Sequence, residues 1–177
     1  MSRAMDYEPL EDLMSLKSLT DLYEEQLKDM YSAEKQLTEA LPKMADGASN
    51  ADLKKAFKDH LKQTQTQMQR LEQIFQARGI SAGRKKCKGM KGLVEEGSEI
   101  LEESNKSAAR DAALIGAAQK AEHYEIATYG SLRTYADLLG EAEQARLLQT
   151  SLDEESQTNE KLTALAQTIN QKAMGGR

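Results

Sequence analysis

The stretch AALIGAAQKAEHYEIATYGSLRTYA, residues 112–136, decides the fold because it sets charged groups inside an apolar helical pattern. Its apolar residues recur at three- and four-residue steps, which is the period of one helical face. Glu125 lies on that apolar face, and Glu122 precedes it by three residues on the same side. A carboxylate that leaves water loses several kcal/mol unless another group neutralises it. We therefore expect a helix whose buried charges need partners from elsewhere in the chain.

The composition of the whole chain is also helical. Apolar residues make up 39% and charged residues 30% of 177 residues, and Val94 is the only valine, so strand-favouring residues are scarce. The net charge of −5 argues against nucleic acid as a partner. With one cysteine, no signal-peptide pattern and no long apolar run, we expect a soluble cytoplasmic protein with no membrane partner.

Over the rest of the chain, the same periodicity predicts four long helices in a single domain over residues 1–177, with a core at about 10–172. The first helix covers about 10–44 and is closed by Pro42 and then by ADGASN, residues 45–50. The second runs from a cap at Ser49 to Gly79, and the others cover about 107–139 and 141–172. Residues 80–106 form a crossover, with a glycine-rich basic loop followed by a short helix.

Two short turns and one long crossover indicate the topology. Helices joined by short turns are antiparallel neighbours, while a connection of about 27 residues can return the chain along the bundle. The sequence therefore predicts an all-α, ferritin-like, up-down-down-up four-helix bundle. A short fifth helix is expected in the crossover between the second and third long helices.

Each long helix carries a polar residue where its apolar pattern would place leucine. Glu34 and His60 each lie about 13 residues from the first turn, roughly 20 Å along the axis. Glu125 and Glu155 each lie about 15 residues from the second turn, so both pairs are level. Any single one of these glutamates could instead lie at a stripe edge and reach water. His60 alone would more often be a hydrogen-bonded core histidine.

Carboxylates that converged in a bundle would raise one another's pKa values if left alone. A pair of divalent ions removes this repulsion, and helical bundles hold di-iron or di-manganese centres through glutamates and histidines. Oxygen ligands with an imidazole suit iron or manganese. We therefore predict a site for two iron or manganese ions, with five ligands: Glu34, His60, Glu122, Glu125 and Glu155.

With these residues in place, the chain resembles the YciE/YciF family of ferritin-like bacterial proteins, whose function is uncharacterised. The resemblance covers nearly all of residues 16–166. It is carried by DMYSAEKQLTEALPKMA (29–45), FKDHLKQTQTQMQRLEQIF (57–75), residues 112–136 and LLQTSLDEESQTNEKLTALA (147–166). It implies a compact bundle, a homodimer, an association with stress responses and a dimetal site at the five residues above.

The sequence departs from the ferritin-like pattern in one respect, because Glu-x-x-His occurs nowhere in it. The site is therefore either asymmetric, completed by weaker ligands such as Gln63, Thr64 or Asn159, or partly lost. Tyr129, one turn after Glu125, could hydrogen-bond a ligand carboxylate or serve as a redox-active, catalytic neighbour. His123 faces Gly116, Ala127 and Gly130, which favours a packing or dimer contact over ligation.

The working hypothesis is a dinuclear iron or manganese protein of the stress response that reacts with peroxide or oxygen. One alternative is a metal-free dimeric interaction protein. Another is a cage that stores iron or protects DNA. The basic run around Cys87 is most simply a solvated loop.

Overall fold

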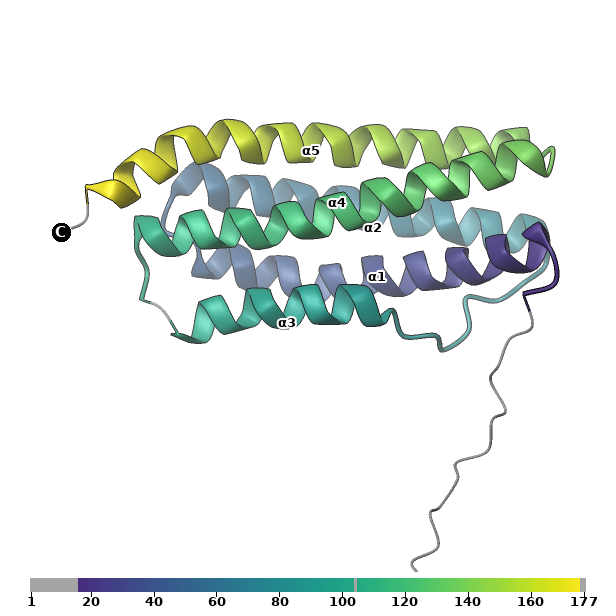
Figure 1. Cartoon of the computed structure of the whole chain (residues 1–177), viewed down its shortest axis with the longest axis horizontal. Helices are drawn as coiled ribbons and strands as arrows, with labels where there is room; N and C mark the ends of the chain where they lie inside the picture. The colour runs from purple at the N-terminus through teal and green to yellow at the C-terminus, as the bar shows by residue number, and fades with distance from the viewer. Residues whose placement is uncertain (1–15, 104, 176–177) are drawn as a thin grey trace, which may run out of the picture.

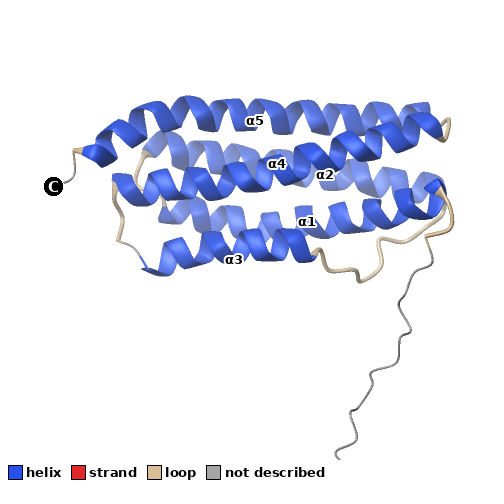
Figure 2. Cartoon of the chain, in the orientation of Figure 1, coloured by secondary structure: helices blue, strands red, loops and turns tan. Residues whose placement is uncertain are grey.

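The structure is a computed structural model that describes residues 16–103 and 105–175. All regular structure in these ranges is helical, as the composition predicted, and no strand is present (Figures 1 and 2). The five helices are α1 (Leu19–Gly47), α2 (Ala51–Arg78), α3 (Lys88–Glu103), α4 (Ala108–Leu138) and α5 (Ala142–Met174). The predicted beginning of the first helix near Leu10 lies outside the described residues.

Two helical hairpins lie side by side along the long axis of the molecule. Short turns join α1 to α2 and α4 to α5, and α3 packs against α1 and α4 (Figure 1). The buried carboxylate of Asp111, in the first turn of α4, accepts hydrogen bonds from the backbone N–H groups of Ser49 (2.7 Å) and Asn50 (2.8 Å). These bonds place the first turn of α4 beside the α1–α2 turn, so α2 and α4 begin at the same end.

The prediction that Pro42 closes the first helix is wrong, whereas the helix does end within ADGASN, residues 45–50. α1 continues through Pro42 to Gly47, and the backbone N–H of Ala48 still bonds to the carbonyl of Met44. Proline removes one backbone donor and normally breaks a helix. Here Met44 and Ala45, in the turn beyond it, are buried in the core, and this packing holds the last turn.

The cap of the second helix is Asn50 rather than the predicted Ser49. The Asn50 side-chain oxygen accepts the N–H groups of Asp52 (2.9 Å) and Leu53 (3.0 Å). Asparagine supplies this acceptor as well as serine does, so the sequence pattern does not separate the two. Gly79 ends α2 in the left-handed conformation with φ +66°, as predicted.

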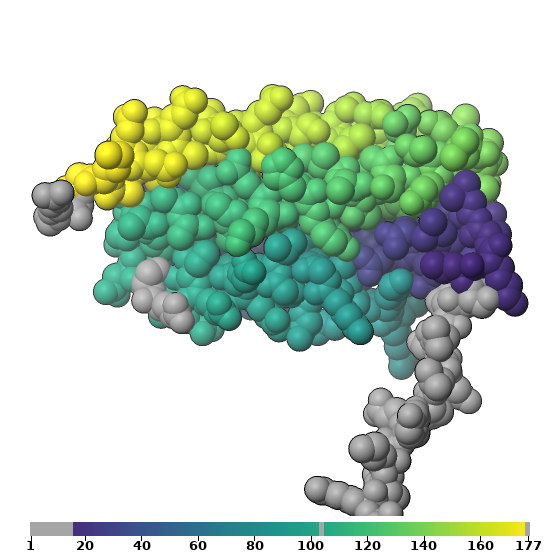
Figure 3. All heavy atoms as spheres, in the orientation of Figure 1, coloured from purple at the N-terminus to yellow at the C-terminus, as the bar shows by residue number. Residues whose placement is uncertain are grey.

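The basic loop of the crossover is shorter than predicted, because α3 already begins at Lys88 and includes Gly89 and Gly92. Gly89 has a packing reason: a Cβ there would lie 2.8 Å from a ring carbon of Tyr124 on α4. Glycine thus permits α3 to approach α4 closely. The side chains of α3, α4 and α5 together form most of one long face (Figure 3).

The core lies between the four long helices and is built from the predicted apolar stripes. Its largest fully buried side chains come from α1, α2 and α4, with Met90 from α3: Tyr23, Leu27, Met30, Leu41, Leu53, Phe57, Leu71, Ile74, Leu114, Tyr129 and Leu132. Leu148 and Leu162 from α5 are also buried. Polar side chains interrupt this core at its centre, where the candidate site lies.

Candidate metal centre

The structure buries all five predicted ligands, each at most 3% exposed. They come from every long helix: Glu34 from α1, His60 from α2, Glu122 and Glu125 from α4, and Glu155 from α5. We call these five residues the carboxylate–histidine cluster. Each is on its helix's buried stripe, so the packing that closes the core also brings them together.

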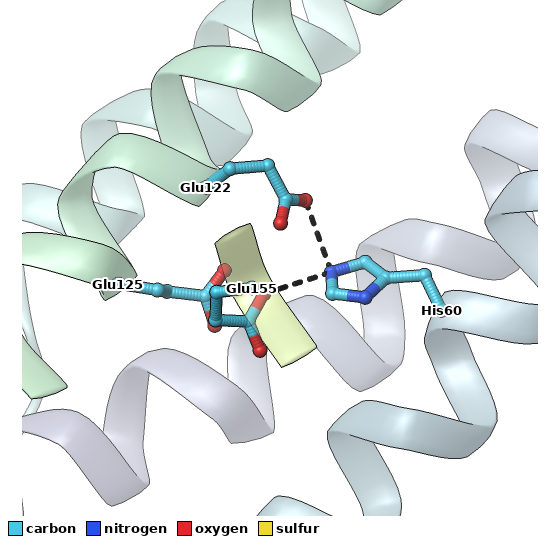
Figure 4. A group of neighbouring side chains, drawn as sticks. All are labelled: His60, Glu122, Glu125 and Glu155. Carbon is cyan, nitrogen blue, oxygen red and sulfur yellow. Dashed lines mark ion pairs between the residues drawn. The ribbon is translucent and has the colours of Figure 1, made fainter. Parts of the chain in front are cut away.

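Four members of the cluster converge closely. One ligand atom from each of His60, Glu122, Glu125 and Glu155 lies within 4.8 Å of the others. The Nε2 atom of His60 lies 3.1 Å from Glu122 Oε1 and 3.8 Å from Glu155 Oε2, with the carboxylates of both α4 glutamates facing the same space (Figure 4). The three-residue spacing of Glu122 and Glu125 places both on one side of α4.

Glu34 adjoins this group from α1. The hydroxyl of Tyr129 donates a hydrogen bond to Glu34 Oε1, so the predicted contact of this tyrosine with a ligand carboxylate is present. Both side chains are 0% exposed. Burial first, and then the negative charge of Glu155, raises the pKa of Glu34 well above its ordinary value.

Most polar atoms of the cluster have no hydrogen-bond partner among the described residues. The atoms concerned are Glu34 Oε2, His60 Nδ1, Glu122 Oε2, Glu125 Oε1 and Oε2, and Glu155 Oε2. Buried polar groups are almost always hydrogen-bonded, and an unpaired one costs about 1–3 kcal/mol. The protein therefore has oxygen and nitrogen atoms at its centre that form no hydrogen bond with its own groups.

The pKa values of the carboxyl groups show the same conflict. Burial raises the pKa of Glu122 to about 7. Burial, followed by the charges of Glu155, Glu34 and Glu122, holds the pKa of Glu125 well above its ordinary value. Burial also raises the pKa of Glu155, although the nearby imidazole of His60 opposes the shift. Positive charge inside the cluster would relieve all of these shifts.

Divalent iron or manganese fits this donor set. Carboxylate oxygens and one imidazole nitrogen are ligands that these ions accept, and the unpaired atoms supply the free lone pairs. Four carboxylates would balance two divalent cations in charge. The residues that would hold the ions are the five members of the cluster.

A supporting hydrogen-bond network, which sequence reasoning missed, orients Glu155. The buried amide of Gln67 on α2 donates to Glu155 Oε1 and, at 3.2 Å, to Glu154 Oε2. Glu154 in turn forms a two-point pair with Arg70, at 2.7 and 2.8 Å. Gln67 lies on the buried stripe of α2, as His60 does. A polar residue at a position where the stripe is otherwise apolar was the sequence feature that could have identified it.

The weaker candidate ligands form hydrogen bonds with groups outside the cluster's carboxylates and imidazole. The hydroxyl of Thr64 donates to the carbonyl of His60, and the side-chain oxygen of Asn159 accepts from Gln119. Gln63 accepts from Thr158. His123 is exposed on the outer side of α4, as its helical angle predicted.

Fold and site together define a class: an all-helical protein with a buried cluster of glutamates and histidine at the centre of its helices. The chain belongs to the family described as Domain of unknown function (DUF892), which matches residues 18–174. It is 48% identical over 162 residues to Protein YciF from Escherichia coli K12, spanning 90% of this chain and 98% of YciF. These matches confirm the resemblance to the YciE/YciF family.

Solved structures agree with this assignment. The crystal structure of the E. coli stress protein YciF aligns with a TM-score of 0.85 and 47% identity over 88% of this chain and 99% of YciF. YcfI from Rhodopseudomonas palustris, for which a structural role has been suggested, aligns with a TM-score of 0.81 and 40% identity, covering 85% of this chain and 96% of that one. A protein from Xanthomonas campestris shares the fold, with a TM-score of 0.71 at 20% identity over 89% of this chain and 97% of that one.

None of the helices in the described part of the chain is both long enough and apolar enough to span a membrane.

Proposed function

We propose that the chain is a ferritin-like, up-down-down-up bundle that binds two iron or manganese ions at the carboxylate–histidine cluster and reacts with peroxide or oxygen. The observation that carries the proposal is the set of unpaired oxygen and nitrogen atoms on the five buried side chains. The stress description of the relative YciF supports a role for this chain in the stress response as well.

The metal ions would supply the change of oxidation state that no side chain of the cluster provides. The protein's own residues have other tasks. Tyr129 holds a proton at Glu34 Oε1, where it can be passed to a neighbouring atom. Gln67 fixes the orientation of Glu155, and Arg70 fixes Glu154 beside it.

A small cavity beside His60 has room for a small oxidant. A cavity of about 40 Å³ between α2, α4 and α5 is lined by His60, Glu122, Gln63 and Thr158. This volume holds only a few water-sized molecules. Hydrogen peroxide and oxygen are of that size.

The test is the metal content of protein purified from cells supplied with both iron and manganese. We expect about two ions per chain in the wild type and almost none in a Glu122→Gln, Glu125→Gln double variant, which keeps the side-chain volumes. Glu160→Gln, on the exposed side of α5, is the matched control and should bind as the wild type does. A wild-type chain that takes up neither ion after anaerobic reconstitution would show that the cluster is not a metal site.

We further propose a homodimer, in line with the resemblance and with the exposed small residues of α4. Gly116, His123 and Ala127 lie along the outer side of that helix. A Cβ atom at Gly116 or Gly130 would meet nothing within 4 Å, so this side of α4 leaves room for a second helix.

A further inference from the structure

A long groove lies between α1, α3, α4 and the loop that precedes α3. It has a volume of about 590 Å³, which is typical of small-molecule sites. Its lining residues on α1 extend from Lys28 to Met44, roughly 24 Å at 1.5 Å per residue. We call it the crossover groove. It shares Glu122 with the small cavity beside His60, and its other lining residues differ.

One end of the crossover groove is strongly basic. The loop before α3 and the facing part of α1 contribute five cationic side chains to its lining: Lys28, Lys35, Arg84, Lys85 and Lys86. Glu25 pairs with two of them, Lys85 at 2.8 Å and Lys28 at 3.3 Å. Lys35, Arg84 and Lys86 form no ion pair with the residues that the structure describes, so three positive charges remain for a ligand.

The loop is held in this position by hydrogen bonds to α1. The amide of Gln36 donates to the carbonyl of Cys87 at 3.1 Å, and the N–H of Cys87 donates to Ser32 Oγ at 2.9 Å. Arg84 and Lys86 precede this anchored residue by three and one positions. These two bonds anchor the end of the basic loop at Cys87 beside α1.

The opposite end of the groove is mainly apolar, although the exposed side chains of Glu39 and Lys43 also line it. Leu37 and Leu41 on α1 form its floor, and the half-buried Val94 and Leu101 on α3 line its wall. Leu101 lies close to Gly47 at the end of α1, since a Cβ on that glycine would overlap its side chain. The groove thus has a cationic end beside the loop that precedes α3 and a mainly apolar end beside the last turns of α1 and α3.

The acidic residues of the lining do not cancel this polarity. Glu95 is paired with Lys91 at 3.0 Å, and Glu39 is an exposed residue of α1 near the apolar end. Glu122 lines the deepest part and is 1% exposed, so its charge is shielded from the opening.

We propose that the crossover groove binds a free anionic single-chain amphiphile, such as a fatty carboxylate. Its head group would pair with Lys35, Arg84 and Lys86. Its alkyl chain would lie over Leu41 and Val94, away from water. Apart from Glu122, the residues that line the groove lie outside the carboxylate–histidine cluster, so dodecanoate binding can be measured separately from metal content.

The test is titration calorimetry of the full chain with dodecanoate below its micellar concentration. We expect one dodecanoate bound per chain, and at least tenfold weaker binding of the equally long dodecanol and dodecylammonium. A Lys35→Glu, Lys86→Glu variant should bind dodecanoate at least tenfold more weakly, while a Lys58→Glu, Lys172→Glu variant, exposed on α2 and α5, should not change it. Val94→Asp should also weaken binding, and circular dichroism verifies that each variant is folded.

Three results would overturn the proposal. The first is the absence of dodecanoate binding by the wild type, and the second is equal affinity for dodecanol. The third is binding of the protein to vesicles of phosphatidylglycerol without binding of free dodecanoate, which would assign the basic end to a membrane surface.

Discussion

The side chain of Glu125 shows how the cluster lowers the stability of the folded protein. Both of its carboxylate oxygens are buried and unpaired, and its pKa is raised by burial and by three neighbouring carboxylates. In the absence of metal, such a group is stable only when protonated. The cluster is thus a region where stability is given up, as expected of a functional site.

This conflict predicts the pH dependence of the metal-free chain. Because the folded-state pKa values are above the unfolded ones, the folded chain binds more protons, and stability falls as pH rises. For Glu122 the loss begins near the ordinary value of 4.5 and is complete above about 7. We expect the melting temperature of chelator-treated protein to be lower at pH 8 than at pH 5 by on the order of 10 °C.

The Glu122→Gln, Glu125→Gln variant supplies the control, since it removes two of the titrating groups. Its melting temperature should change much less between the two pH values. Equal pH profiles for the wild type and the variant would contradict the assignment of the effect to the cluster.

The second prediction concerns the hydroxyl group of Tyr129. Tyr129→Phe removes only the hydroxyl that donates to Glu34, so the site should keep its metal while losing a proton donor. We expect unchanged metal content and peroxide consumption lowered by at least about tenfold, measured from the loss of the ultraviolet absorbance of hydrogen peroxide. Tyr135→Phe, on the same helix and half-buried, should leave both unchanged. A Tyr129→Phe variant of full activity would restrict this tyrosine to a packing role.

Asp111 shows how one side chain positions a whole element. It joins the beginning of α4 to the α1–α2 turn through two backbone N–H groups, and thereby sets the height of Glu122 and Glu125 relative to His60. The sequence did not reveal this role, since an aspartate in the first turn of a helix is common on electrostatic grounds alone.

The role of Asp111 in holding α4 in place can be tested by mutation. Asp111→Ala leaves two backbone donors near the bundle end without their acceptor and should lower the free energy of unfolding by about 1–3 kcal/mol in urea. Asp153→Ala removes an exposed aspartate that accepts one bond from Gln149, and should cost less than about 0.5 kcal/mol. Equal losses in the two variants would show that the Asp111 contacts do not hold α4 in place.

At the scale of the whole molecule, the packing of the two hairpins leaves the outer side of α4 free along Gly116, His123 and Ala127. A second copy of the chain could cover it, because small residues allow close approach of another helix. The mass in solution would then be twice 19.7 kDa.

Sedimentation velocity tests this arrangement. Ala127→Arg should shift the chain from dimer to monomer by placing a long cation in the interface, whereas Ala164→Arg, exposed on α5, should leave the dimer intact. A dimer that survives Ala127→Arg would place the contact on another face.

The four long helices, their apolar stripes and the members of the cluster could all be predicted from the amino-acid sequence. Helical period, caps such as Ser107 and the left-handed Gly79 are local effects, so they are readable along the chain. Glu34, His60, Glu122, Glu125 and Glu155 were recognisable because each breaks an apolar stripe.

The contacts that surround these residues became known from the three-dimensional structure. The pairing of Gln67 with Glu155, the continuation of α1 through Pro42 and the early beginning of α3 depend on contacts between residues far apart in the sequence. The crossover groove exists because a loop is anchored to α1 at Ser32 and Gln36. Local patterns carry no information about such contacts, since their energies depend on which helix becomes the neighbour.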